Sequence, residues 1–169
     1  MLALDAAAAS AAIARAAAIL VDSVAAGARV GFRAPLARAA AEAVWRRVAT
    51  AVAEGRALLL AGFDGGVLAG VLALDLATAE TAPRRAVLTH LLVDPAHRRR
   101  GLARALLQAA EDAAARAGRS LLTVETGGDV AVLRAADWIE AGRIPGAIGN
   151  APATILYRPL SGAGPIAAA

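Results

Sequence analysis

Hydrophobic positions along the chain follow two different periods, and the period indicates which segments form helices and which form strands. Ile13, Ala17 and Leu20 are spaced so that they share one face of a helix, and Asp5 stands where an N-terminal cap is expected. Similar spacing recurs in later segments, and a glycine follows two of them, as is typical of a helix end. Helices are predicted over residues 6–26, 36–54, 101–117 and 130–136.

Runs of leucine, valine and other apolar residues mark the strands. The tripeptide Asp64-Gly65-Gly66 separates two such runs and is typical of a tight hairpin turn. The order of elements indicates an α+β or α/β protein with a mixed sheet. Strands are predicted over residues 1–4, 56–63, 67–76, 86–93, 120–125, 138–144 and 154–160.

The chain length limits the number of domains. A chain of 169 residues can bury one full core and is too short for two ordinary domains. No internal repeat or linker divides the sequence. We therefore expect a single domain over residues 1–160, and a tail over 161–169 that has no structural role because small and turn-forming residues dominate it.

The residue types that are missing exclude several kinds of chemistry. The sequence contains no cysteine, and all 18 basic residues are arginine. Disulfides, thiolate metal sites, a cysteine nucleophile, a P-loop lysine and a Schiff-base lysine are therefore excluded. Only His90 and His97 supply imidazole, so a three-histidine site cannot form and no metal is expected.

The distribution of charge bears on the compartment. Hydrophobic residues make up 59% of the chain, but charged residues occur throughout it, which argues against a membrane-spanning helix. The alanine-rich segment after Asp5 contains Arg15 and lacks the basic start of a signal peptide. We therefore expect a cytoplasmic protein that does not bind membranes.

The most informative segment runs from Leu91 to Ala103, where a strand leads through a short loop into a helix. Gly101 and Ala103 let the backbone approach a ligand closely, and a helix start offers free N–H groups with a partial positive charge. Three consecutive arginines at 98–100 add attraction and bidentate contacts. Together with the net charge of +4, this segment predicts a diphosphate or similar anion at the start of the helix.

Two other interpretations of this segment stay open. Arginine runs are common in loops, so an ordinary strand–loop–helix with a solvated basic loop has the same pattern. Nucleic-acid binding is a third interpretation, but it needs basic residues along a whole face with aromatic residues between them. The two Trp, two Phe and one Tyr are scattered along the chain, so we expect no nucleic-acid partner.

The run Arg98-Arg99-Arg100-Gly101-Leu102-Ala103 resembles the (Q/R)-x-x-G-x-(G/A) signature of the GNAT superfamily of N-acetyltransferases, which bind acetyl-CoA. It follows a strand ending in Val93-Asp94-Pro95, and the order of elements is similar over nearly the whole chain. The resemblance implies an α+β fold of three layers, in which helices flank a mixed, mostly antiparallel central sheet. It also implies acetyl-CoA as the cofactor.

Three further motifs resemble the tabtoxin-resistance type of acetyltransferase within this superfamily. The segment 27–32 (GARVGF) is similar to that group's G-A-S-V-G-F loop. The segment 121–127 (LLTVETG) is similar to its L-L-x-L-D-T-x-x-G strand end, and 142–146 (GRIPG) is similar to its G-E-I/L-P-G-Y turn. These motifs occur in the correct order, which is more specific than any one of them.

The resemblance implies how the cofactor would be held. The backbone of residues 91–93 would pair with the pantetheine arm where two central strands diverge. The amides of the following loop, with the Arg98 side chain, would hold the pyrophosphate. The expected cofactor-binding residues are Leu91, Leu92, Val93, Arg98, Arg99, Arg100, Gly101, Leu102 and Ala103.

Acetyl transfer requires a neutral amine, and about one in a thousand lysine-like amines is uncharged at neutral pH. A base must remove a proton, and an acid assists departure of the coenzyme thiolate. The absence of cysteine indicates direct attack in a ternary complex. Many members of the superfamily carry a glutamate and a tyrosine for these roles, but the corresponding positions here are Val87 and Leu133.

Three other residues are therefore the candidates for base and acid. Glu125 is the first, with a capping or surface carboxylate as its alternative role, and His90 is the second, with a core or sheet-face histidine as its alternative. Tyr157 is the third, with packing against the sheet as its alternative. Strict alternation places Leu88 on the same face as His90. His97 is expected to be a solvent-exposed loop residue.

The leading hypothesis is an acetyl-CoA-dependent N-acetyltransferase that acts on the amine of a small molecule, such as an amino-acid-like compound or an antibiotic. By resemblance, Phe32, Arg33 and Trp138 would border the acceptor pocket. The changes at Val87 and Leu133 support a second hypothesis, an acyl-CoA-binding protein of the same fold that has lost catalysis and acts as a sensor or partner. Homodimers are frequent in the superfamily, so a homodimer is also considered.

Overall fold

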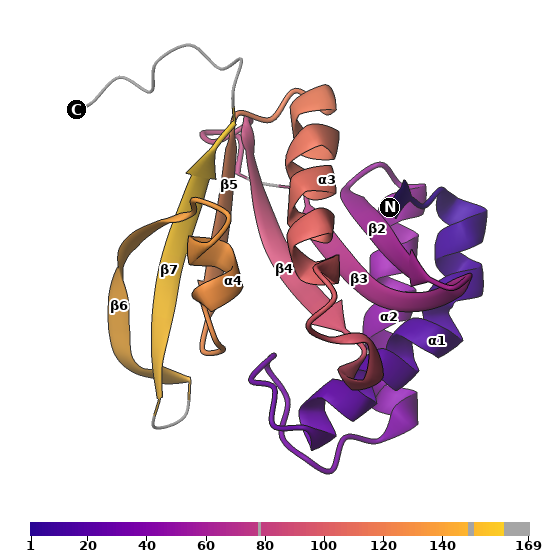
Figure 1. Ribbon diagram of the computed structural model, residues 1–169. Helices are drawn as coiled ribbons and strands as arrows, with labels where there is room; N and C mark the ends of the chain where they lie inside the picture. The colour runs from indigo at the N-terminus through magenta and orange to yellow at the C-terminus, as the bar shows by residue number, and fades with distance from the viewer. Residues whose placement is uncertain (78, 149–150, 161–169) are drawn as a thin grey trace.

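The computed structural model describes residues 1–77, 79–148 and 151–160, which build a seven-stranded sheet (Figure 1). The strands lie across the sheet in the order β1-β2-β3-β4-β5-β7-β6. Neighbouring strands are antiparallel except for β4 and β5, which are parallel. The predicted mixed, mostly antiparallel sheet is confirmed. The strands are β1 (Leu2–Ala3), β2 (Ala57–Asp64), β3 (Val67–Asp75), β4 (Arg85–Val93), β5 (Leu121–Thr126), β6 (Ile139–Ile148) and β7 (Ala151–Pro159).

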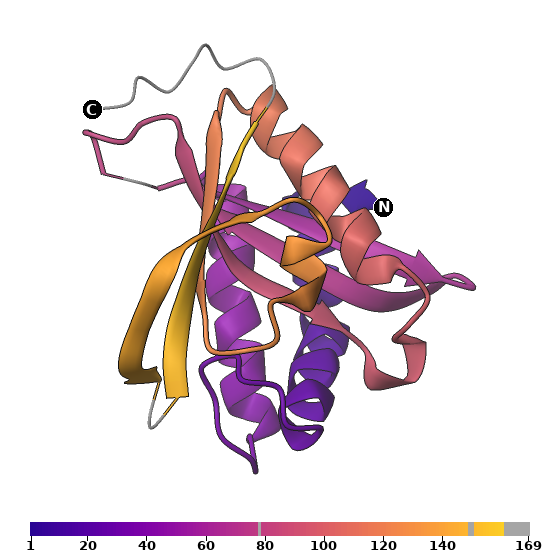
Figure 2. The same ribbon diagram turned by 60° about the vertical axis from the view of Figure 1, so that its left-hand side comes forward.

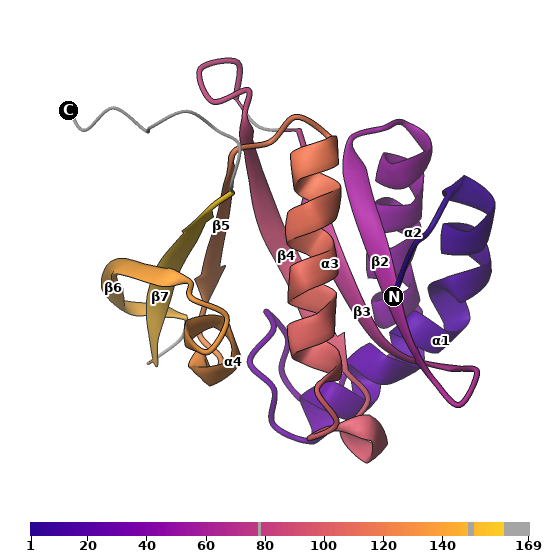
Figure 3. The ribbon, with the colours of Figure 1, turned by 45° about the horizontal axis from the view of Figure 1, so that its top comes forward.

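Helices cover both faces of this sheet (Figures 1, 2 and 3). A hydrophobic core lies between the helices and the sheet on each face. Ile19, Trp45 and Leu59 are buried where the first two helices meet the sheet, and Leu72 and Leu106 are buried on the opposite face. The structure thus has three layers, as expected. The helices are α1 (Ala6–Ala25), α2 (Arg38–Ala53), the 3-10 helix η1 (Pro95–His97), α3 (Leu102–Arg116) and α4 (Ala131–Arg134).

The first helix, α1, is long and apolar enough to cross a membrane by length and composition alone. In the structure, however, Ala17, Ile19 and Leu20 are fully buried in the core shared with α2 and the sheet. Asp22 on the same helix is exposed. A helix with one buried and one exposed face is typical of a helix that packs on the core of a globular protein. The predicted N-terminal cap is also present, because Asp5 accepts a hydrogen bond from the Ala8 N–H.

A β-bulge in β4 changes which side chains share a face. His90 lies opposite Ala73 and Leu88 lies opposite Leu74, so Thr89 is an extra residue between them. Leu88 packs in the core under α3, whereas the His90 ring contacts α2 on the other face. The prediction that Leu88 and His90 share a face is wrong, because one inserted residue reverses the alternation.

The parallel strands β4 and β5 separate soon after they begin. They pair over three positions, from Arg85 opposite Leu121 to Val87 opposite Thr123, and then diverge (Figures 1 and 3). Among the described residues, the edge of β4 over 88–93 that faces β5 has no strand partner. The wedge between the two strands opens beside the start of α3 and the α1–α2 loop, and it positions the site.

The largest differences from the predicted boundaries lie in the last hairpin. The strand predicted over 138–144 continues to Ile148, and its partner begins at Ala151. A register shift between Ile144 and Ile148 lets the pairing continue past Pro145 and Gly146, which sequence reasoning treated as a turn. The predicted tail, 161–169, lies outside the described residues.

Candidate active site

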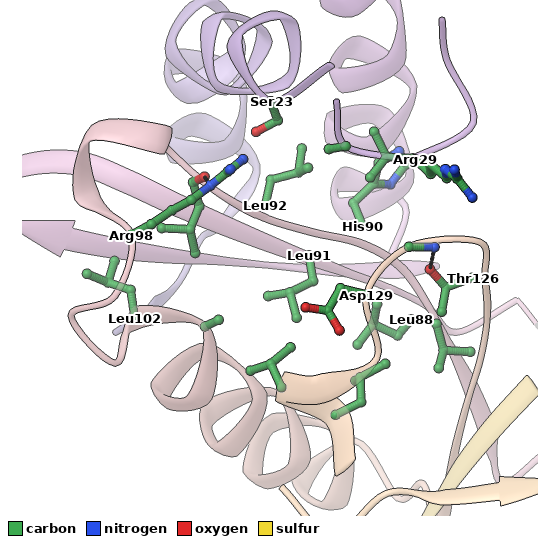
Figure 4. A pocket seen from close by; sticks show the side chains of 18 of the residues that line it. Ser23, Arg29, Leu88, His90, Leu91, Leu92, Arg98, Leu102, Thr126 and Asp129 are labelled. Carbon is green, nitrogen blue, oxygen red and sulfur yellow. Dashed lines mark hydrogen bonds between the residues drawn. The ribbon is translucent and has the colours of Figure 1, made fainter. Parts of the chain in front are cut away.

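A cleft of about 1070 Å³ occupies the wedge between β4 and β5. Its walls come from the α1–α2 loop, β4, the start of α3 and the region from β5 to α4 (Figure 4). All but one of the residues predicted to bind the cofactor line it, and Arg100 does not. Those brought together are Leu91, Leu92, Val93, Arg98, Arg99, Gly101, Leu102 and Ala103.

The loop before α3 has a row of free backbone N–H groups. Gly101 precedes the helix with a φ of 79°, and Arg99 has a φ of 64°, both in the left-handed region. Within the described residues, no backbone N–H from Arg98 to Arg104 donates a hydrogen bond. Left-handed residues alternating with ordinary ones form a concave set of N–H groups, and a helix start favours negative charge. This loop is suited to bind a phosphate.

The arginines near this loop have different positions. Arg98 donates from Nε to a carbonyl at the end of β4 at 3.4 Å, and Arg99 is exposed at the cleft. Arg100 points away, because its Nη1 lies 2.7 Å from Oδ2 of Asp64 in the β2–β3 hairpin. Arg104 lines the cleft and sequence reasoning missed it. Its position three residues after Gly101, on the same helix face, was the available signal.

A partly buried ion pair anchors the start of this loop. The Asp94 carboxylate accepts hydrogen bonds from the Arg15 guanidinium and from the Ala96 N–H, the latter at 2.8 Å. Arg15 also donates from Nε to the Leu68 carbonyl at 3.0 Å. Burial acts to raise the pKa of Asp94, but the Ala96 N–H and Arg15 outweigh it and hold the pKa below its usual range. His97 is half-buried, with Nδ1 3.5 Å from this carboxylate, so the prediction of an exposed His97 is wrong.

His90 has a defined position beside the cleft. Its ring centroid lies 5.2 Å from that of Trp45 in α2, and its Nδ1 lies 3.1 Å from Oγ1 of Thr89. Burial, and then the positive charge of Arg47, lower the pKa of His90 below its ordinary value. The imidazole is therefore neutral at neutral pH and can accept a proton.

The other two candidates for acid–base chemistry differ in position. Glu125 is exposed and lines the cleft from β5, opposite Ile155 of β7. Tyr157 does not line the cleft, because it lies farther along β7 between Thr123 and Ile139. The structure therefore brings Glu125 to the same cleft as His90 and leaves Tyr157 outside it.

Apolar side chains occupy the two positions where the superfamily often carries its base and its acid. Val87 lies at the base of the wedge, paired with Asp75 and Thr123. Leu133 in α4 is buried in the core and also lines the cleft. Neither side chain can exchange a proton, so proton transfer must use other groups of the cleft.

The three residues expected to border the acceptor pocket do not line the cleft. Phe32 is half-buried against the core of α1 and α2, and Arg33 is exposed. Trp138 is only 4% exposed and lies in the core under α3, directly before β6. A large apolar side chain at the start of a strand indicates a buried core position. The resemblance to the family had instead placed Trp138 at the acceptor pocket.

Two loops meet across the cleft, which sequence reasoning missed. A Cβ atom at Gly128 in the β5–α4 loop would lie 3.7 Å from the carbonyl of Arg29 in the α1–α2 loop. The Gly128 N–H donates to Oγ1 of Thr126 at 3.0 Å, and Arg29 lies beside His90 in Figure 4. Asp129 also lines the cleft. Contacts between loops leave no periodic pattern, so no sequence signal was available.

The comparisons with known proteins identify the family. The sequence model of the acetyltransferase (GNAT) family matches residues 28–135, more than half of the chain. The chain therefore belongs to this family, and the predicted N-acetyltransferase activity with acetyl-CoA as cofactor is confirmed at the family level. No curated protein matches the sequence.

Solved structures share the fold over most of the chain at low identity. A ribosomal-protein-alanine N-acetyltransferase from Brucella melitensis has a TM-score of 0.78 and 16% identity, covering 95% of this chain and 100% of that one. A provisionally assigned acetyltransferase from Salmonella typhimurium, solved with its cofactor acetyl-CoA, has a TM-score of 0.74 and 17% identity, covering 95% of each chain. A GCN5-related N-acetyltransferase from Kribbella flavida has a TM-score of 0.74 and 21% identity, covering 89% and 93%.

Proposed function

We propose that this protein transfers the acetyl group of acetyl-CoA to the primary amine of a small molecule, by direct attack in a ternary complex in the cytoplasm. One observation carries the proposal. The unpaired edge of β4 runs from His90, a neutral proton acceptor, to the loop before α3, whose free N–H groups are suited to bind a phosphate. The motifs that resemble the tabtoxin-resistance type support the same activity.

The cleft offers the groups that acetyl-CoA requires. The free N–H groups of residues 98–104, with the side chains of Arg98, Arg99 and Arg104, suit its phosphates. The open backbone edge over 91–93 suits the amides of the pantetheine arm, which would add to β4 like a further strand. When bound, acetyl-CoA supplies an acetyl thioester that is activated for acyl transfer.

In this proposal, Glu125 holds the amine and His90 accepts its proton. An ammonium group is attracted to the exposed carboxylate of Glu125, and the neutral His90 accepts a proton directly or through water. Holding the amine in this position would itself contribute roughly 7–11 kcal/mol to the reaction. Tyr157 lies outside the cleft and has no role in this proposal.

A small acceptor is favoured by the contact between the α1–α2 loop and the β5–α4 loop, because the Arg29 carbonyl beside Gly128 narrows the opening. Two proteins with the same fold carry the names of small acceptors. One is a provisionally assigned phosphinothricin N-acetyltransferase (TM-score 0.75, 20% identity), and the other is an aminoglycoside 6'-acetyltransferase (TM-score 0.63, 14% identity).

Calorimetry and a thiol-release assay test the proposal together. We expect acetyl-CoA to bind at micromolar concentration and small primary amines to cause release of free thiol. Glu125→Gln should lower turnover strongly while the affinity for acetyl-CoA stays unchanged, because the carboxylate acts on the amine. Coenzyme binding without thiol release from any amine would contradict the proposal. Normal turnover of Glu125→Gln would remove the role of that carboxylate.

A further inference from the structure

The half of the sheet formed by β5, β7 and β6 separates its charged residues onto two faces. Glu140, Arg143 and Arg158 lie on the face toward α3 and α4, and each forms an ion pair. Among the described residues of these three strands, Glu125 is the one charged residue on the opposite face. This opposite face is the one toward which His90 points from β4.

The cross-strand register defines this separation, because residues directly opposite each other share a face. Arg158 lies opposite Leu122, and Glu140 lies opposite Leu156. Leu122 and Leu156 are fully buried in the core under α3. Glu125 is an odd number of residues from Leu122 along β5, so it lies on the other face.

On that face, Glu125 has Thr123 beside it on its own strand and apolar side chains beside it on β7 and β6. Ile155 lies directly opposite Glu125, and Tyr157 follows it along β7 with Ile139 as its own partner. Ile155 and Tyr157 are half-buried, and Ile139 is 46% exposed. The helices α1 and α2 lie against β2–β4 and away from β6 and β7 (Figures 1 and 3). We name the surface formed by Glu125, Ile155, Tyr157 and Ile139 the acceptor face.

Resting on the proposed function, we propose that the acceptor is a primary amine with one positive charge and an apolar body, which covers the acceptor face. Its ammonium group lies against the Glu125 carboxylate. Its body lies on Ile155, Tyr157 and Ile139, where removal of apolar surface from water favours binding. Adjacent strands are about 4.8 Å apart and β7 lies between β5 and β6, so the body has to span two spacings, about 9.6 Å, which an ammonium group on the Glu125 side chain followed by an arylalkyl group can do.

Continuity with the cleft supports this occupant. Glu125 belongs both to the cleft and to the acceptor face, so an amine held there has its body on Ile155. A polycation would find one carboxylate on this face, and the other carboxylate at the cleft, Asp129, already accepts the Ala131 N–H at the start of α4. An acidic acceptor would be repelled by Glu125.

Steady-state thiol release with three probes tests the inference: 2-phenylethylamine, spermidine and glycine. We expect kcat/KM to be at least about tenfold higher for 2-phenylethylamine than for the other two amines. One apolar group buried against the protein gives a discrimination of about that size. Ile155→Thr and Ile139→Thr keep a β-branched residue in each strand but remove apolar surface. Each should raise the KM for 2-phenylethylamine about tenfold and leave the KM for acetyl-CoA unchanged.

Val67→Thr is the matched control, because Val67 is 48% exposed at the distant β2–β3 hairpin. It should change neither KM. A preference for spermidine or glycine, or equal effects of Ile139→Thr and Val67→Thr, would overturn the inference.

A direct binding measurement separates this inference from the proposed function. If no amine releases thiol, 2-phenylethylamine is titrated into the protein saturated with CoA. Weaker binding to Ile139→Thr than to the unaltered protein supports the acceptor face although the proposed function fails. Absence of binding, or equal binding to both proteins, overturns it. A dimer that Ile139→Asp dissociates without any change in amine selectivity also overturns it, because a second copy would then cover this face.

Discussion

His90 and Arg47 give a direct test of proton transfer at the residue scale. A protonated imidazole cannot accept a proton, so kcat/KM should fall as the pH drops through the pKa of His90, which burial and Arg47 hold below its ordinary value. Arg47→Ala removes a positive charge and raises that pKa. The acid limb of the pH profile should therefore move to higher pH.

Arg46→Ala is the control for this shift. Arg46 is the preceding residue of α2, is exposed and pairs with Glu42 at 2.8 Å. Its removal should leave the pH profile unchanged, because the pKa of His90 depends on burial and Arg47. Identical profiles for both variants would argue against His90 as the proton acceptor.

Asp94 is expected to contribute to stability and to coenzyme affinity together. Asp94→Asn keeps an oxygen for the Ala96 N–H but loses the negative charge that pairs with the partly buried Arg15 guanidinium. The free energy of unfolding should fall by about 1–3 kcal/mol, and the Kd for acetyl-CoA should rise because the loop before α3 loses its anchor. Denaturant unfolding and calorimetry measure the two effects. Glu42→Gln, which breaks surface pairs, should change the free energy by less than about 1 kcal/mol.

The same carboxylate predicts a pH dependence of stability. Because the folded protein holds the pKa of Asp94 below the unfolded value of about 3.9, its contribution is fully present above that pH. It is lost as the pH falls through the folded pKa. The difference in unfolding free energy between the unaltered protein and Asp94→Asn should therefore be constant near neutrality and shrink under acidic conditions. An unchanged difference in acid would contradict the assignment.

At the scale of elements, substitution of the two glycines that flank α3 distinguishes the effect of backbone strain from the effect of lost ligand binding. Gly101 has a φ of 79° and Gly118 a φ of 75°, and a Cβ atom at either position meets no atom within 4 Å. An alanine at each should therefore cost about 1–2 kcal/mol through the left-handed backbone alone. Only Gly101→Ala should also weaken acetyl-CoA binding, because only Gly101 lies at the cleft.

Unfolding and calorimetry on the two alanine variants measure both quantities. Gly101→Glu should abolish coenzyme binding, since it adds bulk and a negative charge where the phosphates are expected. Equal affinity for acetyl-CoA in Gly101→Glu and in the unaltered protein would remove the phosphate site from this loop.

The parts of the site that could be predicted are those encoded by consecutive residues. The strand, loop and helix from Leu91 to Ala103 follow from local spacing and from the glycine at the helix start, and the structure has them at the predicted place. The bulge at Thr89 is different, because an extra residue in a strand is defined by its pairing with β3. The contact between Arg29 and Gly128 joins segments about a hundred residues apart in the sequence.

At the scale of the whole molecule, acetyl-CoA should stabilise the fold, because its site combines groups from several elements around the wedge. At a concentration 100 times its Kd, the ligand should raise the free energy of unfolding by about 2.7 kcal/mol. For a domain of this size, this corresponds to an increase in Tm of about 5–10 °C. Thermal unfolding with and without acetyl-CoA measures it. Gly101→Glu should show no increase, and an equal increase in that variant would contradict the assignment of the site.

We also propose that residues 1–160 suffice as the domain. Leu160, the last described residue, is buried in the core under α3, and its N–H donates to the Ser120 carbonyl, which supports a boundary after it.

The bulge in β4 has a consequence for how this enzyme can change over time. Beyond Thr89, successive side chains point alternately to two compartments, so Leu91 and Val93 pack on the side of α3 while His90 points to the other side. With the acceptor face proposed above, substitutions at Ile139, Ile155 and Tyr157 would alter the choice of amine and leave the side chains that pack toward α3 unchanged. A library confined to those three positions would search new acceptors while the donor half of the reaction stays constant.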